Sequence, residues 1–114
     1  MYNSCREIKE SILFEILSGY RYRNGERVDT IRECAYRWKV NPNTVHKLYK
    51  YMCDKGILNT QIGKGTYLTQ DVALIESFRL DIAHYLIMNL HRKLSDLNCT
   101  DKEIVEMISF YIKT

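Results

Sequence analysis

The chain has 114 residues, a length that fits one small domain or one domain with a short appendage. It is 46% hydrophobic and 27% charged, with one proline and five glycines, a composition that excludes the disordered and fibrous classes. The net charge of +3 is unevenly distributed. Residues 1–70 contain 12 Lys and Arg against 7 Asp and Glu, whereas residues 71–114 contain 5 against 7. The basic first part indicates a surface that faces a polyanion.

The sequence also limits location and cofactors. It contains no apolar run of the roughly 18–20 residues needed to span a membrane and no secretory signal pattern, so we expect a cytoplasmic protein without a membrane partner. The cysteines form no CxxC pair, and we expect reduced thiols, with Cys34 and Cys53 in the core and Cys99 in a loop. We predict no cofactor. We also predict no metal site within one chain, because His84 and His91 are about 10 Å apart along a helix, too far to bind the same ion. This spacing leaves open a metal site shared between two copies.

The first predicted helix lies in residues 4–20. Ser4 and Glu7 have the spacing of a capping box. Apolar side chains then recur every three or four residues, at Ile8, Ile12, Leu13, Ile16, Leu17 and Tyr20. We expect this helix to end near Gly19-Tyr20.

A loop follows the first helix and turns at Asn24-Gly25. It contains Arg21, Arg23 and Arg27. Two interpretations of these arginines have equal support: a solvated loop, or an edge that contacts phosphates.

Two short helices come next. Thr30 and Glu33 form a second capping box, and a helix to about Lys39 would bury Ile31, Cys34, Ala35 and Trp38. Asn41 followed by Pro42 is a favourable start for another helix. Its buried face would consist of Val45, Leu48, Tyr49 and Met52, and Gly56 would end it.

The pattern then changes from helix to strand. Residues 57–62 and 66–69 are short runs with strand propensity, and Gly63-Lys64-Gly65 between them predicts a hairpin. Asp71 can cap a long helix towards Leu94 or Leu97, apolar on more than one face and therefore expected to have two packing partners. Thr100 and Glu103 form a capping box for a short last helix.

Two helices joined by Val40-Asn41-Pro42 and followed by a basic hairpin predict a winged helix-turn-helix, whose second helix enters the major groove of DNA. Asn41, Asn43 and Thr44 would lie at its start, with His46 and Lys47 on the exposed side. The sequence shows no nucleophile with a base, no pair of catalytic carboxylates and no phosphate-binding glycine loop before a helix. We therefore do not expect an enzyme.

At residues 8–69 the sequence resembles the DNA-binding domain of GntR-family transcription regulators. The resemblance rests on Arg32-Glu33, on "NPNTV", on "KGIL" and on "GKGTYLT". With only two helices after the wing, the chain is most similar to the small YtrA-type subfamily. The resemblance implies that Arg32 contacts a phosphate, that Asn43 and Thr44 open the recognition helix, and that Gly63 and Lys64 enter the minor groove. His46 stands where many members have an arginine that reads guanine.

We therefore predict a mainly α fold with a small β-hairpin wing, a winged helix-turn-helix followed by two dimerisation helices. The domains would be residues 1–70 for DNA binding and residues 71–114 for dimerisation. The function would be that of a homodimeric repressor on a palindromic operator in double-stranded DNA, with room for a small-molecule effector. The alternative is a winged-helix module for protein–protein assembly that does not read DNA.

The predicted site residues form two sets. The DNA-binding set is Arg32, Asn41, Asn43, Thr44, His46, Lys47, Gly63, Lys64 and Gly65. The dimerisation set is Leu74, Phe78, Ile82, Tyr85, Leu86, Ile104, Ile108 and Tyr111.

Overall fold

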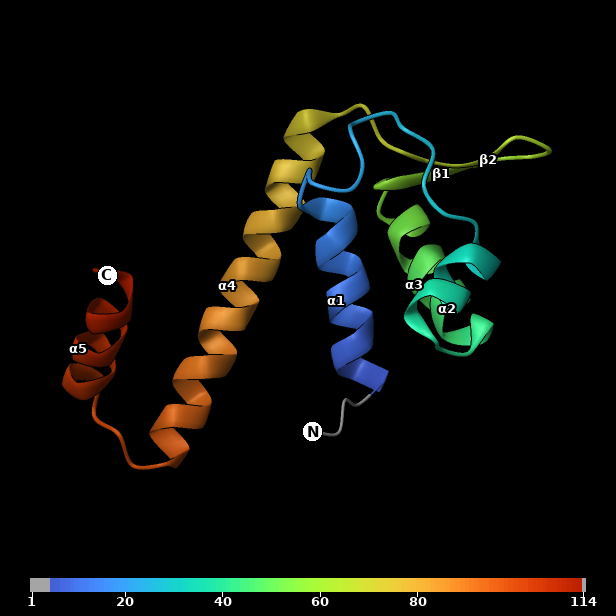
Figure 1. Cartoon of the computed structure of the whole chain (residues 1–114). Coiled ribbons are helices and arrows are strands. Elements are labelled where there is room, and N and C mark those ends of the chain that lie inside the picture. The colour runs from blue at the N-terminus through green and yellow to red at the C-terminus, as the bar shows by residue number, and fades with distance from the viewer. Residues whose placement is uncertain (1–4, 114) are drawn as a thin grey trace. The chain divides into compact units, whose positions relative to one another are not determined.

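The computed structural model describes residues 5–113 and is mainly helical (Figure 1). Its elements in chain order are α1 (Cys5–Leu17), α2 (Ile31–Trp38), α3 (Pro42–Asp54), β1 (Leu58–Gln61), β2 (Gly65–Leu68), α4 (Val72–Asp96) and α5 (Asp101–Ile112). Three helices and a hairpin followed by two further helices confirm the predicted fold class.

Polar caps set the starts of the helices. Thr30 and Thr100 cap α2 and α5, each in a complete capping box with the glutamate three residues later. The side chain of Asp71 accepts a hydrogen bond of 3.1 Å from the Leu74 amide at the start of α4. These three caps confirm the sequence prediction. The box predicted at Ser4 lies outside the described residues.

The end of α1 differs from the prediction. The helix stops at Leu17, and the backbone then turns, with Gly19 at a φ of +83° and the Tyr20 amide bonded to the Ser18 hydroxyl. Tyr20 is therefore 95% exposed and does not belong to the apolar face of α1. In the sequence, the apolar spacing typical of a helix continues past Leu17 to Tyr20, but Gly19 ends the helix.

The core of residues 5–70 is formed by α1, α2, α3 and the hairpin. Its most deeply buried side chains include Ile12, Val45, Met52, Ile57 and Leu58. Cys34 is buried, as predicted, whereas Cys53 and Cys99 are half-buried, and all three are free thiols. Trp38 is half-buried, and its Nε1 is enclosed without a hydrogen-bond partner among the described residues.

The wing contains more backbone pairing than the sequence indicates. β1 and β2 are antiparallel, with Thr60 opposite Thr66 and Gln61 opposite Gly65. Gly65 is thus the first residue of β2 and not part of the turn, because it completes this ladder. The segment before α2 also pairs with β2: Arg27 lies opposite Tyr67, and the Val28 amide donates to the Thr66 carbonyl at 2.9 Å. The turn signal at Asn24-Gly25 predicts a loop for this segment, and the structure adds its pairing with β2.

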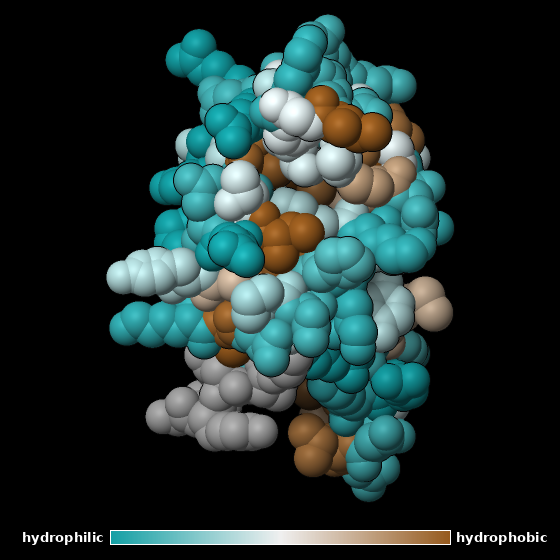
Figure 2. Space-filling view, turned by 90° about the vertical axis from the view of Figure 1, so that its right-hand side faces the viewer, coloured by the Kyte–Doolittle hydropathy of each residue, from teal (hydrophilic) through white to brown (hydrophobic). Residues whose placement is uncertain are grey.

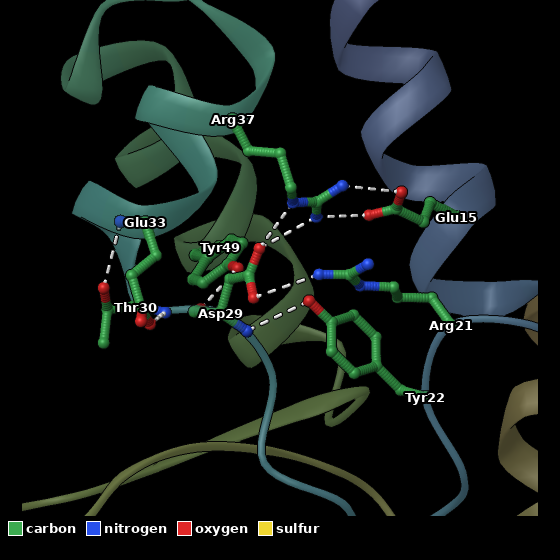
Figure 3. Close-up of polar contacts among 8 residues, drawn as sticks. All are labelled: Glu15, Arg21, Tyr22, Asp29, Thr30, Glu33, Arg37 and Tyr49. Carbon is green, nitrogen blue, oxygen red and sulfur yellow. Dashed lines mark hydrogen bonds and ion pairs between the residues drawn. The ribbon is translucent and has the colours of Figure 1, made fainter.

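Arg37 connects three parts of the fold (Figure 3). Its guanidinium donates to both carboxylate oxygens of Glu15 on α1, at 2.9 and 2.6 Å, and through Nε to Asp29 at 2.9 Å. Asp29 also forms a longer ion pair of 3.8 Å with Arg21. We call Glu15, Asp29 and Arg37 the charged hub. It joins α1, α2 and the segment between them.

Two tyrosines anchor the same segment through its backbone. The Tyr49 hydroxyl on α3 donates to the Asp29 carbonyl at 2.7 Å, and the Tyr22 hydroxyl accepts from the Asp29 amide at 3.1 Å. Burial raises the pKa of both phenols, and it also raises the pKa of the neighbouring Cys34 thiol. The Tyr49 hydroxyl therefore keeps the proton that it donates to the Asp29 carbonyl.

The chain separates into two compact units, the first ending at Ser77 and the second starting at Phe78. The first turns of α4 belong to the first unit, where Ile75 is buried and Leu74 lies beside Gly56. In the second unit, Ile104 is buried and His91 pairs with Asp101 at 2.9 Å. None of the helices within residues 5–113 is long and apolar enough to cross a membrane.

The charged hub should stabilise the fold measurably. Replacing Arg37 by alanine leaves two partly buried carboxylates without their shared donor, and we expect the free energy of unfolding to fall by about 2 kcal/mol in urea denaturation. The control is Arg21→Ala, because its ion pair is longer and its side chain more exposed, and there we expect a loss below about 0.5 kcal/mol. Equal losses in the two variants would contradict the role given to Arg37.

Candidate nucleic-acid interface

Helix α3 has one face in the core and one in solvent. Val45, Leu48, Tyr49 and Met52 are buried, as predicted. Between them the exposed side chains of Asn43, His46 and Lys47 point outward near the start of the helix. The first turn of α3 contains no acidic residue. This exposed face is polar, lacks negative charge near its start and is therefore compatible with an approaching polyanion.

Asn41 and Thr44 sit at the start of α3. The Asn41 side-chain oxygen accepts a hydrogen bond of 2.8 Å from the Asn43 amide and thereby caps the helix. Its side-chain NH₂ group is the part left to contact another molecule. Pro42 occupies the first turn, where a missing amide hydrogen costs nothing. Thr44 is half-buried, so only part of its surface is available.

The wing ends in the turn Ile62-Gly63-Lys64. Gly63 has a φ of +76°, a left-handed conformation that suits glycine, and Lys64 is exposed. Ile62 is 100% exposed, which is unusual for a large aliphatic side chain. In Figure 1 the hairpin extends away from α2 and α3 with its tip free. The tip therefore offers one cation and one apolar side chain to a partner.

An open groove lies between α3 and the hairpin. Its lining includes His46, Lys50 and Cys53 on α3 and Thr60 and Thr66 on the strands. The two threonine hydroxyls are 3.2 Å apart, and the Cys53 sulfur lies 3.6 Å from the Thr60 hydroxyl. Lys50 pairs with Asp54 at 3.3 Å, but both side chains are largely exposed. The groove thus has apolar side chains in its lining together with hydroxyl groups, and it also contains His46 and Lys50.

Arg32 lies in the first turn of α2 and is exposed, while its neighbour Glu33 is held in the capping box. The face with the wing tip and the helix-turn-helix is predominantly hydrophilic, with separate hydrophobic patches (Figure 2). Seven of the nine predicted DNA-binding residues are exposed; Thr44 and Gly65 are half-buried. The nine come from α2, α3 and the hairpin, all within the first unit.

Two features of the structure have no signal in the sequence that predicts them directly. The charged hub was missed because Glu15, Asp29 and Arg37 are distant in the sequence and each is an ordinary surface residue type. The groove residues Thr60 and Thr66 were missed as well, although their alternation with buried Leu58 and Leu68 places them on the same side of the hairpin. Within residues 5–113 no group of three or more His, Cys, Asp or Glu side chains is arranged to hold a metal ion.

Comparisons with known proteins point to one family. A GntR family transcriptional regulator from Listeria monocytogenes has a similar structure, with a TM-score of 0.78 and 30% sequence identity. The comparison covers 95% of this chain and 94% of the Listeria protein. The similarity therefore extends over the hairpin and both C-terminal helices. No protein-family model matches the sequence.

Two Bacillus subtilis (strain 168) proteins are similar in sequence. The HTH-type transcriptional regulator YhcF is 26% identical over 87 residues, which are 76% of this chain and 72% of YhcF. The HTH-type transcriptional repressor YtrA is 40% identical over 47 residues, which are 41% of this chain and 36% of YtrA.

Proposed function

Because the chain belongs to the GntR family of helix-turn-helix transcription regulators, among its small YtrA- and YhcF-like members, we propose that it is a repressor that binds a palindromic operator as a homodimer. The chain is a DNA-binding transcription regulator of a non-enzymatic family. Repression is proposed because YtrA, similar over 47 residues, is by name a transcriptional repressor.

The exposed face of α3 is the observation that best supports DNA reading. In a helix-turn-helix the start of the second helix contacts base edges in the major groove. Asn43, His46 and Lys47 would make these contacts, with the Asn41 amide group beside them. Histidine offers a base fewer hydrogen bonds than a bidentate arginine, so much of the affinity would come from phosphate contacts.

The remaining residues of the DNA-binding set would position the protein. Arg32, at the start of α2, would contact the phosphate backbone beside the major groove, and Thr44 would support the start of α3. The wing tip would enter the minor groove, where Gly63 and Gly65 allow close approach of the backbone and Lys64 supplies a charge. In this arrangement residues 1–70 form the DNA-binding domain and residues 71–114 the dimerisation part.

Exposed apolar side chains in the second unit support a homodimer. Leu86 and Ile108 are each 37% exposed, and Tyr85 and Tyr111 more so, on helices that also expose Met88 and Phe110. Exposed apolar side chains that gather on one surface commonly mark a site of contact with another protein. Phe78 and Ile82 are half-buried and would extend the same interface. Leu74, beside Gly56, and the buried Ile104 would support it from within the protomer.

Two matched double variants test DNA binding. Lys47→Ala with Lys64→Ala removes two cations of the proposed binding face from each protomer. This variant should reduce the salt dependence of binding, d log K/d log[salt], by about 3.6 for a homodimer on a mixed-sequence duplex in fluorescence anisotropy, because each cation lost contributes about 0.9. Lys102→Ala with Lys113→Ala removes the same charge from the second unit and should leave the slope unchanged. Equal effects would contradict the proposed face. A full chain that fails to bind duplex DNA even at low salt would instead support the protein–protein assembly module.

A substitution in the second unit tests dimerisation. Leu86→Asp places a charge in the proposed interface, and we expect sedimentation to show a monomer at concentrations where the parent chain is a dimer. Tyr20→Asp is the control, since Tyr20 is a large exposed side chain in the first unit. The interface would be wrongly placed if both variants stayed dimeric or if Tyr20→Asp alone gave the monomer.

A further inference from the structure

We propose that Arg27 is a second DNA-binding cation of the wing and contacts the phosphate backbone on the side of the wing that faces away from α3. This inference rests on the proposed DNA-binding function and extends it to a residue outside the helix-turn-helix and the hairpin. It also distinguishes between the three arginines of the loop before α2. From the sequence alone, these arginines could belong to a solvated loop or to an edge that contacts phosphates.

The backbone places Arg27 in the wing. The Val28 amide donates to the Thr66 carbonyl, and the Leu68 amide donates to the Glu26 carbonyl, both at 2.9 Å. Arg27 therefore lies directly opposite Tyr67, in an isolated antiparallel bridge beside β2. Residues opposite each other in an antiparallel pair have their side chains on the same face. The Arg27 side chain consequently shares a face of the wing with Tyr67.

This face is the outer one. Leu58 and Leu68 are buried in the core, and Thr60 and Thr66 continue their side of the hairpin towards α3. Tyr67 and Gly65 alternate with these residues and so belong to the opposite side. Arg27 is thus separated from the α3 groove by the hairpin itself.

Gly65 allows the Arg27 side chain to reach towards the wing tip. A Cβ atom at Gly65 would lie 2.7 Å from the Arg27 Nε and 3.4 Å from its Cζ. The guanidinium therefore crosses the wing at the position of the missing side chain, next to Lys64. Gly65 has a φ of +122°, which also favours glycine there. The hairpin turn ends at Lys64 and does not itself require a glycine at position 65. The close approach of the Arg27 side chain explains the glycine there.

The other two arginines have different surroundings. Arg21 forms an ion pair with Asp29 at 3.8 Å, beside the charged hub. Arg23 lies two residues before Gly25, and the Gly25 amide donates to the Leu68 carbonyl. Leu68 is at the end of β2 that is distant from the wing tip. Arg27 is exposed and forms no ion pair with any residue in the range 5–113. Of the three, Arg27 is both unneutralised and close to the wing tip.

The geometry of duplex DNA indicates which phosphate backbone Arg27 would contact. A wing that enters the minor groove has a phosphate backbone on each side. One backbone separates the minor groove from the major groove that holds α3, and it would lie in the groove lined by Lys50, Thr60 and Thr66. The other faces the outer side, where Arg27 lies. A planar guanidinium is well suited to a phosphate, which it can bind through two hydrogen bonds.

The test compares arginine variants of the full chain on a mixed-sequence duplex over a range of salt concentrations. Arg27→Ala should weaken binding several-fold and reduce the salt dependence of binding by about 0.9 per protomer, which is about 1.8 for a homodimer, whatever the sequence of the duplex. Arg27→Lys retains the charge and should restore most of the slope. Arg23→Ala is the matched control, an exposed arginine of the same loop, and should bind within about twofold of the parent chain. Thermal unfolding verifies that each variant is folded.

A second variant tests the path of the side chain. Gly65→Ala would displace the Arg27 guanidinium, so its effect on DNA binding should be smaller in an Arg27→Ala background than in the parent chain. Purely additive losses would contradict the contact with Gly65.

Three results would overturn the assignment of Arg27. The first is an unchanged salt dependence of binding in Arg27→Ala when Lys64→Ala reduces it, and the second is an equal loss of affinity in Arg27→Ala and Arg23→Ala. The third is a loss of affinity confined to A·T-rich duplexes, which would place the Arg27 side chain inside the minor groove. In each of these results the parent chain still binds DNA. A parent chain that does not bind duplex DNA would refute the proposed function itself.

Discussion

The bidentate pairing of Arg37 with Glu15, and its shared bond to Asp29, is the constraint on which the DNA-binding part depends. It ties α2 to α1 and fixes the segment that precedes α2 (Figure 3). Tyr49 extends the same connection to α3 by donating to the Asp29 carbonyl. The position of α3 and the pairing of Arg27 with the wing therefore follow from contacts centred on one short segment.

Local signals were sufficient to predict most of the secondary structure. Thr30, Asn41 and Thr100 begin their helices because capping depends on neighbouring residues alone. The interior face of α3 followed from its period for the same reason. The end of α1 could not be predicted in this way, because the apolar pattern continued to Tyr20 while the backbone turned at Gly19.

Contacts between distant residues were not visible in the sequence. Glu15 and Arg37 are 22 residues apart, and neither side chain is unusual for a surface position. The pairing of Arg27 with Tyr67 joins residues on either side of α2 and α3, so no local pattern marks it as a strand. Most of the predicted DNA-binding residues are exposed, whereas Ile104 of the dimerisation set is buried. The sequence could not show that Asn41 is partly engaged in capping or that Gly65 makes room for an arginine.

The uneven charge of the sequence acquires a structural meaning. The basic surplus lies in residues 1–70, which contain the helix-turn-helix and the wing, whereas residues 71–114 have a small acidic surplus and form helices with large exposed apolar side chains. The central claim is that a homodimer places two copies of α3 in successive major grooves. Selection of binding sites from a random pool of duplex DNA tests it most directly. We predict two inverted half-sites whose centres are about 10 bp, or a multiple of this, apart. A single unrepeated site, or no enrichment of any sequence, would contradict the account.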